Sequence, residues 1–244
     1  MQQDLPRAQV PGGGAVTLVS TWGGDLDAVH TARCSFARYT LSTDSTPTHL
    51  NERDSKLLAY LWREGHTSPF RHSGLKFLVT CPLFVLRQWQ KHQVGCAWNE
   101  ASGRYIPLGH AAHDPTGGWR QAPEGSVKQG SGAALAPPTQ AAAQKVYEDA
   151  LTHAQHAYHA LVSLGVAREQ ARMVLPLSTL TQSVWTCSLQ ALVHFLKLRL
   201  DAHAQAETRD YAHAVLHLTW HHAPQFRASL RATLDPKHLA DLAD

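Results

Sequence analysis

The segment from Lys91 to Tyr105, KHQVGCAWNEASGRY, gathers side chains that can bind an anion. It contains a lysine, a histidine, a carboxylate, a hydroxyl and an arginine, with glycines between them. Glycines let backbone N–H groups approach a ligand closely, and guanidinium groups bind phosphates through two parallel hydrogen bonds. A buried structural element does not need this combination, so the segment predicts a site for a phosphate-bearing ligand.

Two arginines further along the chain are candidate partners for the same ligand. Arg172 stands in the apolar run EQARMVLPL, where an arginine requires an anion or a carbonyl as partner. Arg199, His203 and Glu207 follow one another at i, i+4 and i+8, which on a helix places them on one polar face. With Glu100 as an acceptor for a sugar or base, these residues predict a nucleotide-sized anion site. Surface ion pairs are the alternative interpretation.

The spacing of apolar residues predicts the elements that position these side chains. We expect a strand at 16–20, helices at 25–36 and 51–65, a strand and then a Pro-initiated helix over 74–90, and helices at 141–164, 167–175 and 182–222. An apolar stripe of the last helix should face the core: Leu189, Leu192, Val193, Leu196 and Leu200.

The remaining segments have few apolar residues in a regular pattern. Residues 1–15, with three consecutive glycines, are expected to form a loose tail. Residues 109–140 include ten Gly or Pro among 32 and are expected to form a long loop. Because both flanks of this loop carry what looks like one site, we expect a single catalytic domain over 16–244. Lys128 and the glycines of this loop either fold over a ligand or face solvent.

Composition limits the class of protein. The chain has 244 residues, of which 43% are hydrophobic and 17% charged, as is ordinary for a soluble globular protein. A net charge of +3 without a Lys/Arg cluster disfavours nucleic-acid and membrane-surface partners. The four cysteines form no CxxC pair and no signal-peptide pattern is present, so we expect a cytoplasmic protein.

The 17 histidines suggest a rival from another class, a metal-dependent helical hydrolase. Two sets have helical spacing: His153, His156 and His159, and His213, His217 and His221. Two histidines at i and i+4 can bind zinc. No HExxH motif is present, and no carboxylates cluster with these histidines in the sequence. Solvated helix faces are therefore favoured, and no metal site is predicted.

Six stretches of the sequence occur in the order of one known family: DLDAVHTARCSF, LLAYLWREGHTSPFRH, PLFVLRQWQKH, NEASGRY, GVAREQARMVLPL and LKLRLDAHAQAETRDYA. They cover most of the chain, and HxxGxxxNExSGRY after LRQWQK resembles the signature of the flavin-dependent thymidylate synthases. The resemblance implies an α/β (α+β) fold, with a mixed or antiparallel sheet packed with helices and long C-terminal helices. It implies a homotetramer whose active sites lie between subunits. The implied reaction is reductive methylation of dUMP to dTMP, with FAD as hydride carrier, methylenetetrahydrofolate as one-carbon donor and NADPH as reductant.

The resemblance also implies roles for individual residues. Arg199 matches the uracil-contacting arginine and is the implied catalytic residue, because a fixed cation stabilises the charge that develops as C5 becomes nucleophilic. The implied substrate-binding residues are Gln88, Trp89, Gln90, Lys91, Glu100, Ala101, Ser102, Gly103, Arg104, Arg172 and Arg199. The implied flavin-binding residues are Ser68, Lys91, His92, Gln93, Glu100, Ser188, Leu189, Gln190 and His194.

The sequence departs from the common signature mainly around the flavin. The changed positions are Lys91, Gln93, Ser188, Gln190 and His194. The interval from His92 to Ser102 is one residue longer, an insertion that Gly95 can absorb. Two flavin-facing cations are lost with these changes, which leaves open a non-catalytic nucleotide binder without flavin. A flavin-dependent methylase of UMP or another uridine nucleotide is the alternative within the same chemistry.

Two residues of the signature are candidate nucleophiles. A lone cysteine such as Cys96 is usually a small apolar residue rather than a reactive one. No His–Asp pair stands in an obvious relay to Ser102, so hydrogen bonding to a phosphate is favoured for its hydroxyl.

Overall fold

The computed structural model describes residues 5–38, 49–106, 111–115, 117–123, 130–240 and 242. Its strands are β1 (Arg7–Val10), β2 (Gly14–Trp22), β3 (Gly74–Pro82), β4 (Cys96–Glu100) and β5 (Leu180–Ser188). Its helices are α1 (Asp25–Arg33), α2 (Glu52–Arg63), α3 (Leu83–Trp89), α4 (Pro137–Ser163), α5 (Arg168–Ala171), α6 (Leu189–Arg199), α7 (Ala206–His222), α8 (Arg227–Thr233) and α9 (Lys237–Ala240). Four 3-10 turns accompany them: Cys34–Phe36, Ser68–Arg71, Arg172–Val174 and Pro224–Phe226.

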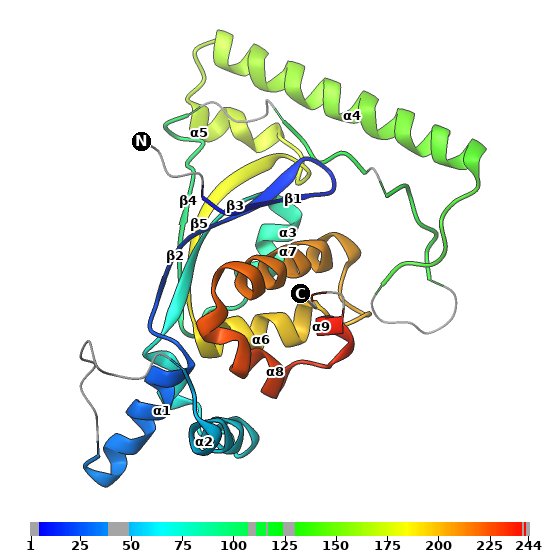
Figure 1. Ribbon diagram of the computed structural model, residues 1–244. Coiled ribbons are helices and arrows are strands. Elements are labelled where there is room, and N and C mark those ends of the chain that lie inside the picture. The colour runs from blue at the N-terminus through cyan, green and yellow to red at the C-terminus, as the bar shows by residue number, and fades with distance from the viewer. Residues whose placement is uncertain are drawn as a thin grey trace.

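The strands form one antiparallel sheet in the order β1-β2-β3-β5-β4. β3 and β5 pair along their whole lengths, from Gly74 opposite Ser188 to Pro82 opposite Leu180. Leu75, Phe77 and Val79 of β3 are fully buried, because alternate side chains of a strand point to one face. The predicted strand and Pro-initiated helix over 74–90 are confirmed as β3 and α3. Helices α6 and α7 cover one face of the sheet (Figure 1).

The core lies between this sheet face and the two helices. Trp89 of α3 stacks on Phe195 of α6, with ring centroids 4.6 Å apart, and meets Trp185 of β5 edge-on at 5.0 Å. The predicted apolar stripe of α6 is buried, as expected: Leu189, Leu192, Val193, Leu196 and Leu200. Asn51 caps the start of α2, since its side chain accepts a hydrogen bond from the backbone N–H of Asp54 at 2.9 Å.

The prediction of a loose N-terminal tail is wrong for residues 7–15. β1 pairs with β2 from Arg7 opposite Thr17 to Val10 opposite Gly14, so this segment is an edge hairpin. Gly12 and Gly13 adopt φ values of 84° and 89°, a region that glycine enters without steric cost. The consecutive glycines therefore build a tight turn.

The predicted helix over 182–222 is wrong in two places. Its first residues belong to β5, in which Thr181, Ser183, Trp185 and Cys187 are buried in alternation. The chain also leaves the helix after Arg199 and starts a new one at Ala206. In the connection, the Asp201 carboxylate accepts from the backbone N–H of His203 at 2.8 Å. Arg199, His203 and Glu207 therefore do not share one helical face.

The predicted loop over 109–140 ends earlier than expected, because α4 begins at Pro137, where proline is favoured in the first helical turn. Isolated bridges pair Ala112 with Thr179 and Arg120 with Ala134, so parts of the loop are tied down. Lys128 lies outside the described residues.

α4 extends away from the sheet (Figure 1), and Tyr158 is its one buried residue. Within the described ranges no helix combines the length and apolarity that a bilayer span requires.

Candidate active site

The guanidinium of Arg199 is held in a fixed orientation at the end of α6. Its Nε donates to Nε2 of His92 at 3.0 Å, and its Nη2 donates to the backbone carbonyl of Gln88 at 3.3 Å. His92 lies in the turn after α3, and its ring packs edge-on against Phe195 at 5.2 Å. The remaining N–H groups of Arg199 are available to a ligand in a cavity of about 790 Å³.

The protonation of His92 follows from this environment. Burial lowers the pKa of His92 to about 4, and the charges of Arg199 and His194 act in the same direction. The imidazole is therefore neutral at pH 7, with its proton on Nδ1 while Nε2 accepts from Arg199. Burial also lowers the pKa of Arg199, which nevertheless stays charged as a guanidinium. The pair thus presents a fixed, partly desolvated cation.

Guanidinium, amide and imidazole side chains line the cavity beside this pair. They include Gln88, Arg120, Arg199, His203, Gln205 and Arg209. Arg209 donates to the carbonyl of Ala202 at 2.9 Å, while Arg120 forms an ion pair with Glu207. Sequence reasoning missed Arg120, Gln205 and Arg209. The only signal for the last two is their place in the block LKLRLDAHAQAETRDYA, and nothing local points to Arg120.

A second group of predicted residues lies at the other end of β4. Arg104 forms an ion pair with Glu169, with Nε and Oε2 3.1 Å apart, and Arg172 Nε donates to the carbonyl of Glu169 at 3.4 Å. The Ser102 hydroxyl accepts from the Arg104 backbone N–H at 3.3 Å, and Glu100 accepts from the Thr181 hydroxyl at 3.0 Å. The Arg172 side chain is exposed, and the Glu169 carbonyl is a partner of the kind expected for it.

β4 therefore separates the predicted nucleotide-binding residues into two groups. The strand has five residues, which corresponds to roughly 17 Å at about 3.4 Å per residue. Across the parts of the chain that the structure describes, no hydrogen bond or ion pair joins the group of Ser102, Arg104 and Arg172 to Arg199, and none of the three lines the Arg199 cavity.

Several predicted flavin-binding residues gather near the start of α6. Gln190 and His194 line a cavity of about 590 Å³ together with Thr67, the neighbour of Ser68. The His194 ring also meets His92 edge-on at 5.5 Å, so this cavity adjoins the Arg199 pair. Lys91 and Gln93 are exposed in the turn on either side of His92.

The same cavity contains cations that sequence reasoning missed. Arg63 and Lys197 line it, and Arg71 donates to Oε1 of Gln190 at 2.6 Å. The sequence lacks two cations that the common signature has around the flavin. These side chains supply positive charge in the same region. Cations, amides and a hydroxyl form a donor set that fits the pyrophosphate and ribose of a dinucleotide flavin.

Other predicted residues have structural roles in the chain. The side chains of Trp89 and Leu189 are fully buried in the core, so they do not reach a ligand. The Ser188 hydroxyl caps α6 by accepting from the backbone N–H of Ala191 at 3.2 Å. Gly95 has φ 74°, and a Cβ there would lie 2.5 Å from Ser188 Oγ, so the turn that absorbs the longer interval requires glycine.

The remaining predicted positions follow the strand and turn that carry them. Gln90 and Ala101 are half-buried, and Gly103 is buried. Burial raises the pKa of the Cys96 thiol, which disfavours the thiolate that a nucleophile needs.

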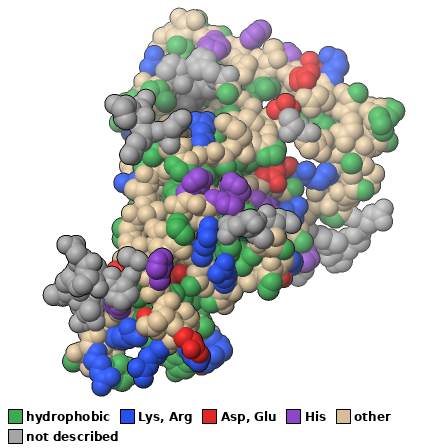
Figure 2. All heavy atoms as spheres, in the orientation of Figure 1, with side chains coloured by type: hydrophobic (Ala, Val, Ile, Leu, Met, Phe, Trp, Pro, Cys, Tyr) green, Lys and Arg blue, Asp and Glu red, His purple; other side chains and the backbone are tan. Residues whose placement is uncertain are grey.

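The histidines of α7 are spread along an exposed face of the helix. Figure 2 shows one face of the molecule, with histidine side chains near its middle. His217 and His221 are close neighbours, with ring centroids 4.5 Å apart, while His213 faces His238 at 6.3 Å. Among the residues with described positions, no group of three or more His, Cys, Asp or Glu side chains is arranged to hold a metal ion.

Comparison with known proteins shows the family of the chain. The family model described as thymidylate synthase complementing protein matches residues 17–225. A flavin-dependent thymidylate synthase from Thermus thermophilus is 41% identical over 212 residues, which cover 86% of this chain and 73% of the relative. One from Pseudothermotoga lettingae is 36% identical over 202 residues, 83% of each chain.

Solved structures show the same similarity. The crystal structure of the UMP/dUMP methylase PolB from Streptomyces cacaoi bound with 5-Br UMP is 29% identical, with a TM-score of 0.76 over 93% of this chain and 96% of that one. The same enzyme bound with 5-Br dUMP is 30% identical, with a TM-score of 0.76 over 92% and 96%. The chain therefore belongs to the flavin-dependent thymidylate synthase family, whose members are methyltransferases.

Proposed function

We propose that this enzyme methylates C5 of dUMP to give dTMP, with methylenetetrahydrofolate as one-carbon donor, NADPH as reductant and FAD as hydride carrier. The observation that carries the proposal is the fixed guanidinium of Arg199, held by His92 and the Gln88 carbonyl at the wall of a nucleotide-sized cavity. The relatives named as flavin-dependent thymidylate synthases support the reaction.

Arg199 supplies the electrostatic part of the reaction. The uracil C5 becomes nucleophilic when negative charge moves onto the C4 carbonyl oxygen and N3. A preorganised cation beside that edge stabilises this charge without reorganisation during the reaction. Neutral His92 keeps the guanidinium oriented without adding a second charge, because its lowered pKa leaves it unprotonated at neutral pH.

The cavity near the start of α6 is the proposed flavin site. Gln190, His194 and Lys197, with Arg63 and Thr67, would hold the pyrophosphate and ribose of FAD. When bound, the flavin supplies the hydride chemistry of the reduction. The side chains of this protein bind and orient it next to the Arg199 cavity.

We also propose that the single domain over 16–244 works as a cytoplasmic homotetramer with active sites between subunits. The two groups at the ends of β4 support this, since Ser102, Arg104 and Arg172 of one protomer then complete the phosphate side of the Arg199 cavity of another. Exposed apolar side chains are available for such an interface, for example Met173, 77% exposed, and Leu164, 81% exposed. Four free cysteines fit a reducing compartment.

The test is product analysis with each nucleotide. The purified enzyme is incubated with FAD, NADPH and methylenetetrahydrofolate, together with dUMP or UMP, and the methylated product is quantified by chromatography. We expect dTMP from dUMP. UMP is the second candidate substrate, because the similar methylase PolB is named for both UMP and dUMP. Preferential methylation of UMP would make UMP the substrate in place of dUMP.

Absorbance and light scattering complete the test. Added FAD should give the spectrum of a bound flavin, and static light scattering should give the mass of four chains. A protein that binds nucleotide but no flavin, even at high micromolar FAD, would instead be a non-catalytic binder. A monomer with full activity would remove the proposed sharing of sites between subunits.

A further inference from the structure

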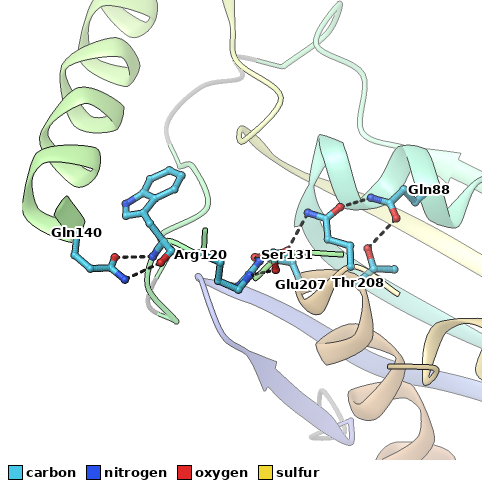
Figure 3. Close-up of polar contacts among 8 residues, drawn as sticks. Gln88, Arg120, Ser131, Gln140, Glu207 and Thr208 are labelled. Carbon is cyan, nitrogen blue, oxygen red and sulfur yellow. Dashed lines mark hydrogen bonds and ion pairs between the residues drawn. The ribbon is translucent and has the colours of Figure 1, made fainter. Parts of the chain in front are cut away.

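A continuous relay of polar side chains runs from residues 117–123 to α3 (Figure 3). Arg120 forms an ion pair with Oε1 of Glu207, and Arg120 Nε donates to the Ser131 hydroxyl at 2.6 Å. The other carboxylate oxygen of Glu207 accepts from Nε2 of Gln205 at 2.9 Å. Oε1 of Gln205 accepts from Nε2 of Gln88. The backbone of Gln88 in turn accepts from Arg199, so the relay ends at the proposed catalytic residue.

The direction of this relay is set by the charge of Glu207. Burial alone would raise the pKa of Glu207, but hydrogen bonds from Arg120 and Gln205 and the charge of Arg120 hold the pKa below its ordinary value. The carboxylate is therefore ionised at neutral pH, and an ionised carboxylate only accepts hydrogen bonds. As a result, the Gln205 amide must turn its NH₂ group to Glu207 and its carbonyl to Gln88.

The second amide follows from the first. Because Gln205 presents its carbonyl, Gln88 must present its NH₂ group, and its own Oε1 then faces the Thr208 hydroxyl, which donates at 3.4 Å. The oxygen and nitrogen of an amide are similar in size, so only such a network decides which way it points. Here the orientation of both amides depends on one ion pair.

Gln205 keeps hydrogen-bonding capacity for a ligand. A primary amide has two N–H donors and two acceptor lone pairs, and the relay uses one of each. One donor and one acceptor remain on a side chain that lines the same cavity as Arg199. Uracil presents a carbonyl acceptor at C4 next to the N3–H donor, whereas cytosine presents an amino donor next to an N3 acceptor. An amide free to flip fits either base, and an amide with fixed orientation distinguishes them.

We propose that Gln205 determines specificity by reading the carbonyl and N3–H edge of the pyrimidine, and that Arg120 and Glu207 are positioning residues that prevent its amide from flipping. The inference rests on the proposed function, since it takes a uracil nucleotide as the ligand of this cavity. It adds a discrimination against cytosine nucleotides that acts through residues 117–123, a segment outside the signature.

The test compares the affinities of the FAD-supplemented enzyme for dUMP and dCMP by isothermal titration calorimetry. We expect the natural enzyme to prefer dUMP by ~100-fold or more, because a site built from fixed donors and acceptors strongly rejects the wrong pattern. In Glu207→Gln, the neutral amide can donate as well as accept, so the Gln205 amide can reverse. The dUMP/dCMP affinity ratio should then fall by ~10-fold or more, chiefly through tighter binding of dCMP.

The chain offers a matched control and a second variant. Glu52→Gln makes the same chemical change in the exposed Glu52–Lys56 pair of α2 and should leave the ratio unchanged. Gln205→Ala removes the amide itself and should also lower the ratio, through weaker binding of dUMP. This variant serves as the test where Glu207→Gln does not fold. An unchanged ratio in folded Glu207→Gln, or in Gln205→Ala where that variant stands in, overturns the inference.

The result for the natural enzyme separates the two proposals. Methylated product from dUMP together with equal affinity for dUMP and dCMP would overturn the role of Gln205 and leave the proposed function in place. Absence of both dUMP binding and methylated product would overturn the proposed function, and with it this inference.

Discussion

Acidification should destabilise the folded chain through His92, and the size of the effect follows from its environment. The pKa of His92 is lowered from 6.5 to about 4, first by burial and then by the charges of Arg199 and His194. As the pH falls below 6.5, the unfolded chain therefore takes up a proton that the folded chain does not. The contribution is fully present above pH 6.5 and is lost as the pH falls toward 4.

The magnitude can be worked out from the two pKa values. Each pH unit in this window changes the free energy of unfolding by ~1.4 kcal/mol, which gives about 2.5 kcal/mol by pH 4.5. The His92 ring is 8% exposed, and solvent at its edge should reduce the effect to ~2 kcal/mol. His92→Gln is the matched variant, because its Oε1 can accept from Arg199 Nε and does not titrate.

The assay is urea unfolding at pH 7.5 and pH 4.5, followed by circular dichroism at a fixed protomer concentration. Other titrating groups are the same in both proteins, so the difference between their losses isolates His92. We expect the natural protein to lose ~2 kcal/mol more than His92→Gln between the two conditions. Equal losses would refute the buried, neutral state of His92 and with it the described geometry of the Arg199 pair.

Three further substitutions test the assigned roles. Arg199→Ala should abolish methyl transfer while the far-UV circular dichroism spectrum stays unchanged, and turnover near the natural level would remove its catalytic role. Arg104→Ala should raise the KM for the nucleotide by roughly 10- to 100-fold through loss of a charge-assisted phosphate contact, with kcat little changed, and an unchanged KM would count against that contact. Asp25→Ala should lower the free energy of unfolding by ~2 kcal/mol, since it leaves the buried hydroxyl and backbone N–H of Ser229 without their acceptor, and urea unfolding would measure the loss.

The sheet shows how far local patterns could predict this fold. The short apolar run VTLVS predicts part of β2, and the alternating apolar residues of 74–82 predict β3. β5 has the same alternation, but its buried positions include Thr181 and Ser183, which hydropathy does not count as core residues. The residues Thr181, Val184, Trp185 and Thr186 favour a strand, and that propensity was the available signal. The strong helical spacing of the residues that follow masks this signal.

The N-terminal turn and the helix break differ from the prediction for another reason. Three glycines after Val10 are compatible with a loose tail, but consecutive glycines are also typical of a tight hairpin turn. The break after Arg199 contains neither glycine nor proline, and its local signal is Asp201, whose side chain competes for backbone N–H groups. In both cases the residue type allowed two conformations, and pairing with distant segments decided between them.

The residues of the candidate site could also be predicted only in part. His92 and Arg199 were predicted individually, but their hydrogen bond joins residues 107 positions apart. The pairs Arg120–Glu207 and Gln88–Gln205 are 87 and 117 positions apart, and no local pattern indicates either. Such contacts arise when α7 packs on β1 and β2, because that packing brings the start of α7 to the cavity.

The position of β4 explains why a signature that is continuous in sequence does not form one site in a protomer. β4 is the edge strand next to β5, and its register holds Glu100 opposite Ser183 and Cys96 opposite Cys187. A strand cannot fold back on itself over five residues, so the residues on its two sides must face different parts of the molecule. His92, before the strand, accepts a hydrogen bond from Arg199, and Arg104, after it, forms an ion pair with Glu169 of α5. If Ser102, Arg104 and Arg172 hold the phosphate as proposed, a nucleotide whose base lies at Arg199 takes these contacts from another chain. We therefore expect protomers that are kept apart to bind dUMP far more weakly than the assembled enzyme.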